Sequence, residues 1–268
     1  MPVNRDRAAV VAAAIAAQAR SAGEPVALVH VCRAAVELLS AAATGVLMLS
    51  DYSGAYEPVQ VHGLLGEKLT ELQVTYGEGP GVTALAQDRP VLVPDLAAGG
   101  TGRRWPMLVP AALQLGARAA FAFPLLAGRL AVGTLEIWRE TPGWLSDEQA
   151  ADALLLADAA LTQLLAQLHA PQQHLALPPY ADGPEAFMDR WPQVHQATGM
   201  VSVQLGTNLT TAFLRLRAHA FAHGTANGHS LRQAAEAVVD GRLSFASDPD
   251  PPPGARPGPG PGGTAPDL

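Results

Sequence analysis

A proline-rich segment at residues 171–184 most constrains how this chain can fold, because it separates two stretches that can each form a packed core. Residues 1–170 are long enough for one full-sized domain, and residues 185–246 are long enough for a smaller one. Residues 247–268 are rich in Pro and Gly, cannot bury a core and are expected to be disordered. We therefore expect a large N-terminal domain, a connector, a small C-terminal domain and a tail.

Composition and charge limit the class of protein. Hydrophobic residues make up 49% of the chain and charged residues 15%, which is typical of a globular protein. A net charge of −7 argues against a protein that coats nucleic acid non-specifically, but it leaves a small local site open. Cys32 is the only cysteine, so no intramolecular disulfide can form. The apolar run at 8–17 is much shorter than the roughly 20 residues of a membrane span, and we expect a cytoplasmic protein with no membrane partner.

Helical and strand-like patterns alternate in the N-terminal part without a regular βαβ rhythm. Two pairs of strand patterns are each joined by a short turn, which indicates hairpins and antiparallel pairing. Ser146 and Gln149 have the spacing of a capping box, which marks the start of a long helix. We therefore predict an α+β domain with one antiparallel sheet and packed helices. The expected helices are 5–22, 25–42, 82–87, one ending near 115, and one from the Ser146 cap to 169; the expected strands are 45–50, 58–63, 91–93, 118–126 and 130–138.

The sequence contains no recognisable catalytic constellation. The glycines at 77, 79 and 81 are not followed by Lys and Ser or Thr, which excludes a phosphate-binding P-loop. One cysteine and scattered histidines do not have the spacing of a zinc site. Nothing in the chain resembles a nucleophile elbow. We expect a protein that is not an enzyme and uses no cofactor or metal.

Four short segments of the N-terminal part carry a family resemblance. They are Leu-Gln-Val-Thr-Tyr-Gly-Glu-Gly-Pro-Gly at 72–81, Arg-Trp-Pro at 104–106, Ala-Phe-Pro-Leu at 122–125 and Pro-Gly-Trp-Leu-Ser at 142–146. This succession resembles the GAF half of actinobacterial GAF–ANTAR regulators. The resemblance implies a GAF-type antiparallel sheet with packed helices, and a sensory role toward an unknown small-molecule or protein effector.

GAF domains often hold a small molecule in a pocket between the sheet and the helices. Aromatic residues at the observed spacing could line such a pocket or belong to the core, and Asp95 could contact a ligand or cap the segment that follows it. Both interpretations stay open for each residue. The candidate pocket residues are Tyr76, Asp95, Trp105 and Phe123.

Leucines in the predicted helix that ends at 169 recur three and four residues apart, which is coiled-coil spacing, and a second apolar line runs beside them. A helix that is apolar on more than one face must be covered from two sides. It is either buried deep in its own domain or packed partly against a partner subunit, and GAF-containing regulators commonly dimerise through such helices. The candidate residues of a homodimer interface are Leu154, Leu161, Leu164 and Leu168.

Three segments in the C-terminal part carry a second resemblance. They are His-Gln-Ala-Thr-Gly-Met-Val-Ser-Val-Gln-Leu-Gly at 195–206, Ala-Phe-Leu-Arg-Leu-Arg-Ala-His-Ala at 212–220 and Leu-Arg-Gln-Ala-Ala-Glu-Ala-Val-Val at 231–239. This order resembles the ANTAR domain, a small three-helix module that binds RNA in transcription antiterminators. Thr198 stands where the family pattern has Lys. The resemblance implies binding to paired stem-loops in nascent mRNA, which prevents an intrinsic terminator from forming.

The C-terminal part is almost neutral, so RNA recognition there would rest on a few arginines and polar groups that read loop bases and phosphates. Arg215 and Arg217 could serve in this way or could form a solvated helix face. Gln196 could read a base or be a surface amide. Gly199 lies in mid-helix, and we expect a neighbouring helix to approach it closely. The candidate RNA-binding residues are Gln196, Thr198, Arg215, Arg217, His219 and Arg232.

These observations favour an RNA-binding transcription antitermination regulator in which a GAF sensor controls an ANTAR domain. The alternative is an ANTAR-like module that has lost RNA binding and works through protein contacts. Thr198 in place of Lys and the near-neutral charge of the C-terminal part favour this alternative. A DNA-binding helix-turn-helix is a third possibility, but the last helix is too apolar to be a recognition helix.

Overall fold

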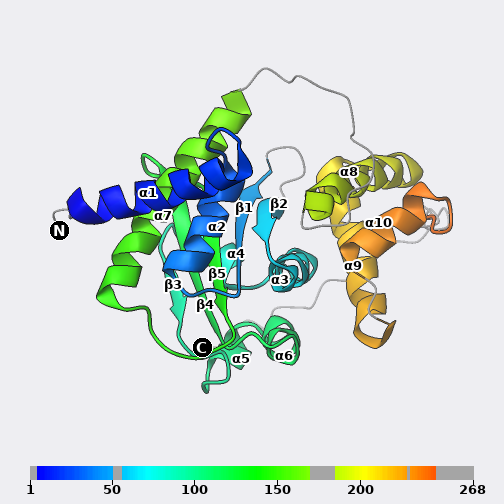
Figure 1. The fold of residues 1–268 in the computed structure, drawn as a ribbon. Coiled ribbons are helices and arrows are strands. Elements are labelled where there is room, and N and C mark those ends of the chain that lie inside the picture. The colour runs from blue at the N-terminus through cyan, green and yellow to red at the C-terminus, as the bar shows by residue number, and fades with distance from the viewer. Residues whose placement is uncertain (1–4, 51–55, 170–184, 228–229, 246–268) are drawn as a thin grey trace, which may run out of the picture.

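A computed structural model of the protein describes residues 5–50, 56–169, 185–227 and 230–245 (Figure 1). The predicted connector and the predicted tail lie outside the described residues. In chain order the elements are α1 (Arg5–Ala22), α2 (Leu28–Leu38), β1 (Ala43–Leu49), β2 (Tyr56–His62), α3 (Leu64–Tyr76), α4 (Pro80–Gln87), β3 (Val91–Val93), α5 (Thr101–Arg104), α6 (Leu108–Gln114), β4 (Ala119–Ala127), β5 (Leu130–Arg139), α7 (Asp147–His169), α8 (Glu185–Leu205), α9 (Leu209–Asn227) and α10 (Leu231–Val239).

Within the described residues, the strands form one five-stranded sheet in the order β2-β1-β5-β4-β3. Each neighbouring pair is antiparallel, including the two hairpins expected from the sequence. The turn between β4 and β5 is tight, and Gly128 adopts a φ of 70° there, which a residue without a side chain adopts at little cost. The predicted antiparallel sheet with packed helices is confirmed.

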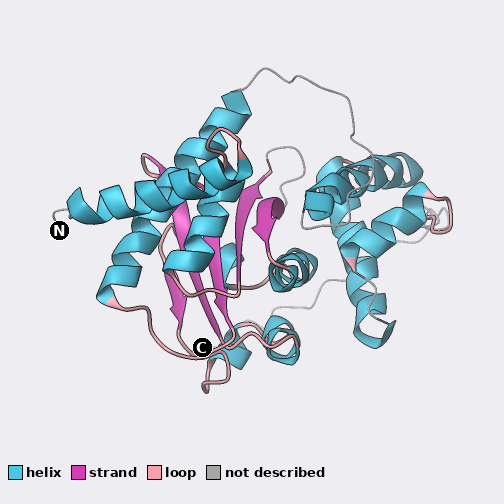
Figure 2. Ribbon diagram, viewed as in Figure 1, coloured by secondary structure: helices cyan, strands magenta, loops and turns pink. Residues whose placement is uncertain are grey.

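Helices cover both faces of this sheet (Figure 2). Helices α1, α2 and α7 form one layer, and α3, α4 and α6 form the other. Because side chains alternate along a strand, β5 sends Leu135 and Ile137 to the first layer and Glu136 and Trp138 to the second. The capping box of α7 is present, since Ser146 Oγ accepts from the Gln149 backbone N–H and the Gln149 side chain accepts from the backbone N–H of Ser146.

Helices α8, α9 and α10 pack together around their own buried apolar residues, among them Val194, Phe213 and Leu216. Val61 of β2 and Val74 of α3 belong to the same apolar cluster. The C-terminal helices therefore lie against one edge of the sheet and against α3, as Figure 1 shows.

The sequence patterns did not identify helix α3, which contacts α9 and α10. One expectation about local structure was wrong. Gly199 was expected to touch a neighbouring helix, but a Cβ built there meets nothing within 4 Å. Among the described residues, no helix is both long and apolar enough to span a membrane.

Candidate functional site

A buried polar pair fills the space between the sheet and helices α3 and α4. The side-chain amide of Gln73 donates to both carboxylate oxygens of Glu136, at 2.8 and 2.9 Å. Its own oxygen accepts the backbone N–H of Gly81 at 3.1 Å, so one side chain links α3, α4 and β5. Burial raises the pKa of Glu136 to about 7, while hydrogen bonds from Gln73 and Trp138 favour the charged form and oppose this rise.

Glycines make room for this pair. A Cβ at Gly81 would lie 1.6 Å from Glu136 Oε1, and a Cβ at Gly79 would lie 2.2 Å from Gln73 Oε1. Gly45, which pairs with Glu136 across the β1–β5 ladder, would place a Cβ 3.8 Å from Oε2 of the carboxylate. The glycine spacing that excluded a P-loop therefore serves packing, and the inner space is occupied by the protein's own side chains.

The outer side of α3 meets the C-terminal helices through complementary charge. Glu71 Oε1 accepts the backbone N–H of Arg232 at 3.2 Å, in the first turn of α10. A carboxylate is stabilised at that position by the free amides and the positive end of the helix dipole. A carboxylate from the sheet domain thus occupies the start of α10, where the free amides of a helix can bind an anion.

The opposite end of α3 receives a positive charge. Gly77 ends the helix with a φ of 68°, and a Cβ built on it would lie 3.0 Å from Nη1 of Arg217. The guanidinium therefore sits at the negative end of the α3 dipole. Burial lowers the pKa of Arg217, and the nearby Tyr56 opposes the shift.

Two further contacts join the same surfaces. His195 Nε2 of α8 lies 3.1 Å from Glu57 Oε2 of β2, and this hydrogen-bonded pairing raises the pKa of His195. Tyr76 and Phe221 meet edge to face, with ring centroids 5.9 Å apart. We call this set of contacts between β2 and α3 on one side and α8, α9 and α10 on the other the junction.

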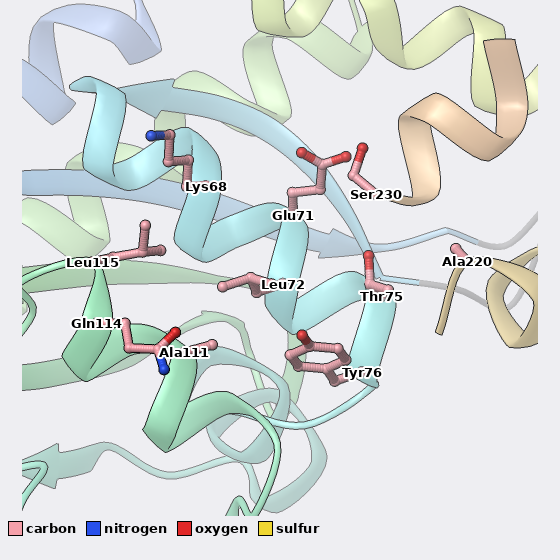
Figure 3. Close-up of a pocket in the computed structure, with 10 residues that line it drawn as sticks. All are labelled: Lys68, Glu71, Leu72, Thr75, Tyr76, Ala111, Gln114, Leu115, Ala220 and Ser230. Atoms are coloured by element: carbon pink, nitrogen blue, oxygen red, sulfur yellow. The ribbon is translucent and has the colours of Figure 1, made fainter. Parts of the chain in front are cut away.

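A cavity of about 430 Å³ opens at the junction (Figure 3). Its main wall is one stripe of α3 that carries Lys68, Leu72 and Thr75, and α6 provides the facing wall. Ala220 of α9 and Ser230 at the start of α10 close its far side. The volume is in the range of small-molecule sites.

The predicted RNA-binding residues do not lie together on one exposed surface. Gln196 and Arg215 are exposed, and His219 is partly buried where it stacks on His223, with ring centroids 4.0 Å apart. Arg217 and Arg232, by contrast, take part in the junction.

The prediction that Thr198 contacts RNA needs correction. Thr198 is 2% exposed, and its hydroxyl donates to the backbone oxygen of Val194 at 2.7 Å within α8. This position faces the core of the C-terminal helices and not the solvent.

The four predicted pocket residues divide among three places. Tyr76 lines the junction cavity. Asp95 and Trp105 line a separate groove of about 280 Å³ beside the edge strand β3, where Arg104 lies 4.9 Å from the centre of the Trp105 ring. Phe123 is 3% exposed and packs in the core on the α7 side of the sheet, so its assignment to a pocket was wrong.

The four predicted interface leucines also have different surroundings. Leu154 is 54% exposed on α7, and Leu161 is partly buried against the core. Leu164 is 1% exposed and packs inside its own domain, which removes it from any interface with a partner in this arrangement. The side chain of Leu168 lies outside the described part of the structure.

Sequence reasoning missed the groups on the sheet-domain side of the junction and the buried pair behind them. The local sequence held one signal, the single carboxylate of Glu136 between Leu135 and Ile137 in an otherwise apolar strand. Glu57 and Glu71 look like ordinary surface carboxylates in the sequence, because their partners lie far along the chain.

A family of known proteins matches most of the N-terminal part of the chain. The family described as "GAF domain" matches residues 21–162. Among solved structures, the GAF domain of a phosphoenolpyruvate-protein phosphotransferase from Acinetobacter is similar at 10% identity and a TM-score of 0.47, over 65% of this chain and 99% of that one. The corresponding domain from Coxiella burnetii is similar at 18% identity and a TM-score of 0.45, over 60% and 96%. No curated protein sequence matches this chain significantly.

Proposed function

This chain belongs to the GAF domain family, and on that premise we propose that it is a transcription antitermination regulator that responds to a signal. In this proposal the GAF domain, residues 1–170, senses an effector and performs no catalysis. Residues 185–246 form an ANTAR domain that binds stem-loops in nascent mRNA, and the protein acts as a homodimer. The exposed Leu154 on α7 supports an interface with a second copy.

One observation carries the regulatory part of this proposal. Groups that the ANTAR resemblance assigns to RNA are held by the GAF domain, with Arg217 at the end of α3 and the Arg232 backbone N–H on Glu71. A carboxylate on a helix N-terminus occupies the place that an RNA phosphate would take. The junction therefore supports a docked state that binds RNA weakly.

Release of the junction then provides the switch. Gln196 and Arg215 stay exposed in the docked state, whereas Arg217 and the first turn of α10 become available only after release. An effector that binds the released state more tightly than the docked state shifts the population toward RNA binding.

The test is fluorescence anisotropy of the full chain with a tandem stem-loop RNA at physiological salt, with scrambled-loop RNA as the reference. Glu71→Gln weakens the docked state, and we expect it to bind the stem-loop RNA severalfold more tightly than wild type. Glu140→Gln is the matched control, because it removes the same negative charge from an exposed position outside the junction. Equal affinities of these two variants would show that only net charge changed.

A protein-contact module is the second candidate, favoured by the surface of α8. Val203 is 84% exposed there, beside Met200, which is half-buried. If wild type and Glu71→Gln both fail to distinguish the stem-loop from the scrambled RNA, RNA binding is excluded and this candidate replaces it.

A further inference from the structure

In the described part of the GAF domain, side chains of the protein itself occupy the space between the sheet and helices α3 and α4. Glu136 is fully buried there, and Gln73 bridges it to the backbone of Gly81. Even a methyl group at Gly79 or Gly81 would collide with these two side chains. A small-molecule effector must therefore use another surface, or else displace a hydrogen-bonded buried pair.

We propose that the junction cavity is a binding site for a small organic acid with an apolar, ring-sized body. The apolar part of the wall consists of Leu72 and Tyr76 of α3, Ala111 of α6 and Leu115 directly after α6, which face the same space (Figure 3). A volume of about 430 Å³ accepts a body of one or two rings.

An unsatisfied hydroxyl points to a ligand in this cavity. Thr75 is 5% exposed and lines the cavity, and its Oγ1 has no hydrogen-bond partner among the described residues. Buried polar groups of folded proteins nearly always have a partner. A polar atom of the bound molecule would supply that partner on the side of the cavity toward Ser230.

The charged side chains that line the cavity determine which charge the ligand carries and how it is oriented. Lys68 is exposed at one end of the α3 stripe, and it is the only cationic side chain that lines the cavity in the described part of the chain. Glu71 lies one helical turn further along α3, between Lys68 and Thr75, and is engaged with the first turn of α10. An anionic head is attracted by Lys68 and repelled by Glu71, so the acid group lies at the Lys68 end and the apolar body extends toward Tyr76.

The site lies where it can influence the junction. Ala220 and Ser230 belong to the C-terminal helices, so the cavity keeps its shape only while these helices are docked. A ligand that fills it favours the docked state. This regulatory consequence rests on the proposed function, whereas the binding site itself does not.

The test uses 2-naphthoate as the probe acid and 2-naphthalenemethanol as its neutral analogue, titrated against the full chain and followed by ligand-observed NMR. We expect the acid to bind more tightly than the alcohol, and Lys68→Gln to lower the affinity for the acid about threefold, as suits an exposed charge. Thr75→Val removes only the hydroxyl and is expected to weaken binding about fivefold. Thermal unfolding of each variant checks that the fold is intact.

A pair of filling variants locates the site. Ala111→Leu fills the junction cavity and is expected to lower affinity at least tenfold, while Ala98→Leu fills the groove beside β3 and is expected to leave it unchanged. Absence of binding, or a loss in Ala98→Leu with none in Ala111→Leu, would overturn the proposal. RNA anisotropy with and without 2-naphthoate follows separately, so that failed regulation can be distinguished from failed binding.

Discussion

The side-chain amide of Gln73 holds both oxygens of the Glu136 carboxylate, at 2.8 and 2.9 Å, across the space between α3 and the sheet. Helix α3 also carries Glu71, which contacts α10, and it ends at Gly77, which lies beside Arg217 of α9. The same helix therefore binds the buried carboxylate and contacts both C-terminal helices. A change in the position of α3 on the sheet would therefore alter both the Glu71 contact with α10 and the Arg217 contact at Gly77.

The first prediction concerns pH. Glu136 has a folded-state pKa of about 7, above its ordinary value of 4.5, so the folded chain binds a proton more tightly than the unfolded chain. The free energy of unfolding therefore falls as pH rises from about 4.5 to about 7, and it levels off above that range. The full effect is roughly 3 kcal/mol, at 1.36 kcal/mol for each pKa unit.

Glu136→Gln is the variant that isolates this effect, because it cannot ionise. Urea unfolding at several pH values should show that its stability relative to wild type increases between about pH 5 and about pH 8, a range that brackets the shifted pKa of Glu136. The raised pKa of His195 also makes the free energy of unfolding fall as pH rises, but it does so equally in wild type and in the variant. Parallel pH profiles for the two proteins would disprove the assignment to Glu136.

The second prediction concerns two glycines that differ in their surroundings. Gly81→Ala places a methyl group on the Glu136 carboxylate and should destabilise the fold by about 1–3 kcal/mol, the usual range for overpacking. Gly199→Ala is the matched control, since its Cβ meets open space in the middle of α8, and it should stabilise the fold by up to about 1 kcal/mol. Chemical denaturation measures both, and equal effects in the two variants would contradict the packing described around Gly81.

Most of the sheet could be predicted from the sequence because its signals are local. Hairpin signals and the Ser146 cap act over a few residues. The structure has both antiparallel strand pairs and the cap where the pattern indicates, while residues 51–55 lie outside the described residues. Helix α3 could not be found in this way. It contains Gly66 and the β-branched Val74, which disfavour a helix by themselves, and its packing on the sheet decides the outcome. A Cβ at Gly66 would lie 3.0 Å from Val61 Cγ1, so the glycine lets the helix approach β2.

The junction was beyond sequence reasoning for a different reason. Glu71 and Arg232 are 161 residues apart in the chain, and Gln73 and Glu136 are 63 apart. The periodic spacing of apolar and polar residues in the sequence does not indicate which distant residues will form such pairs. The sequence could predict that Arg217 carries a charge on α9, but only the fold shows that the charge meets the end of α3.

The third prediction concerns assembly. Leu154→Asp places a charge on the exposed face of α7 and should shift the protein from dimer toward monomer in size-exclusion chromatography with light scattering. Leu130→Asp is the control, because it places the same charge at a side chain that is 66% exposed on β5 and does not belong to α7. A wild-type mass for the Leu154 variant would remove this part of α7 from the proposed interface.

The last prediction separates Arg215 from Arg217, which lie two residues apart on α9 but in different surroundings. Arg215 is exposed, so Arg215→Ala removes a potential phosphate contact, and it should weaken stem-loop binding about five- to tenfold. Arg217→Ala removes a proposed RNA contact and also a contact that holds the docked state. These two effects oppose each other, so its net change in RNA affinity should be smaller than that of Arg215→Ala. In the Glu71→Gln background, where docking is already weakened, the loss caused by Arg217→Ala should approach that of Arg215→Ala. Anisotropy titrations of the four variants measure this, and additive effects of Glu71→Gln and Arg217→Ala would mean that Arg217 does not contribute to docking.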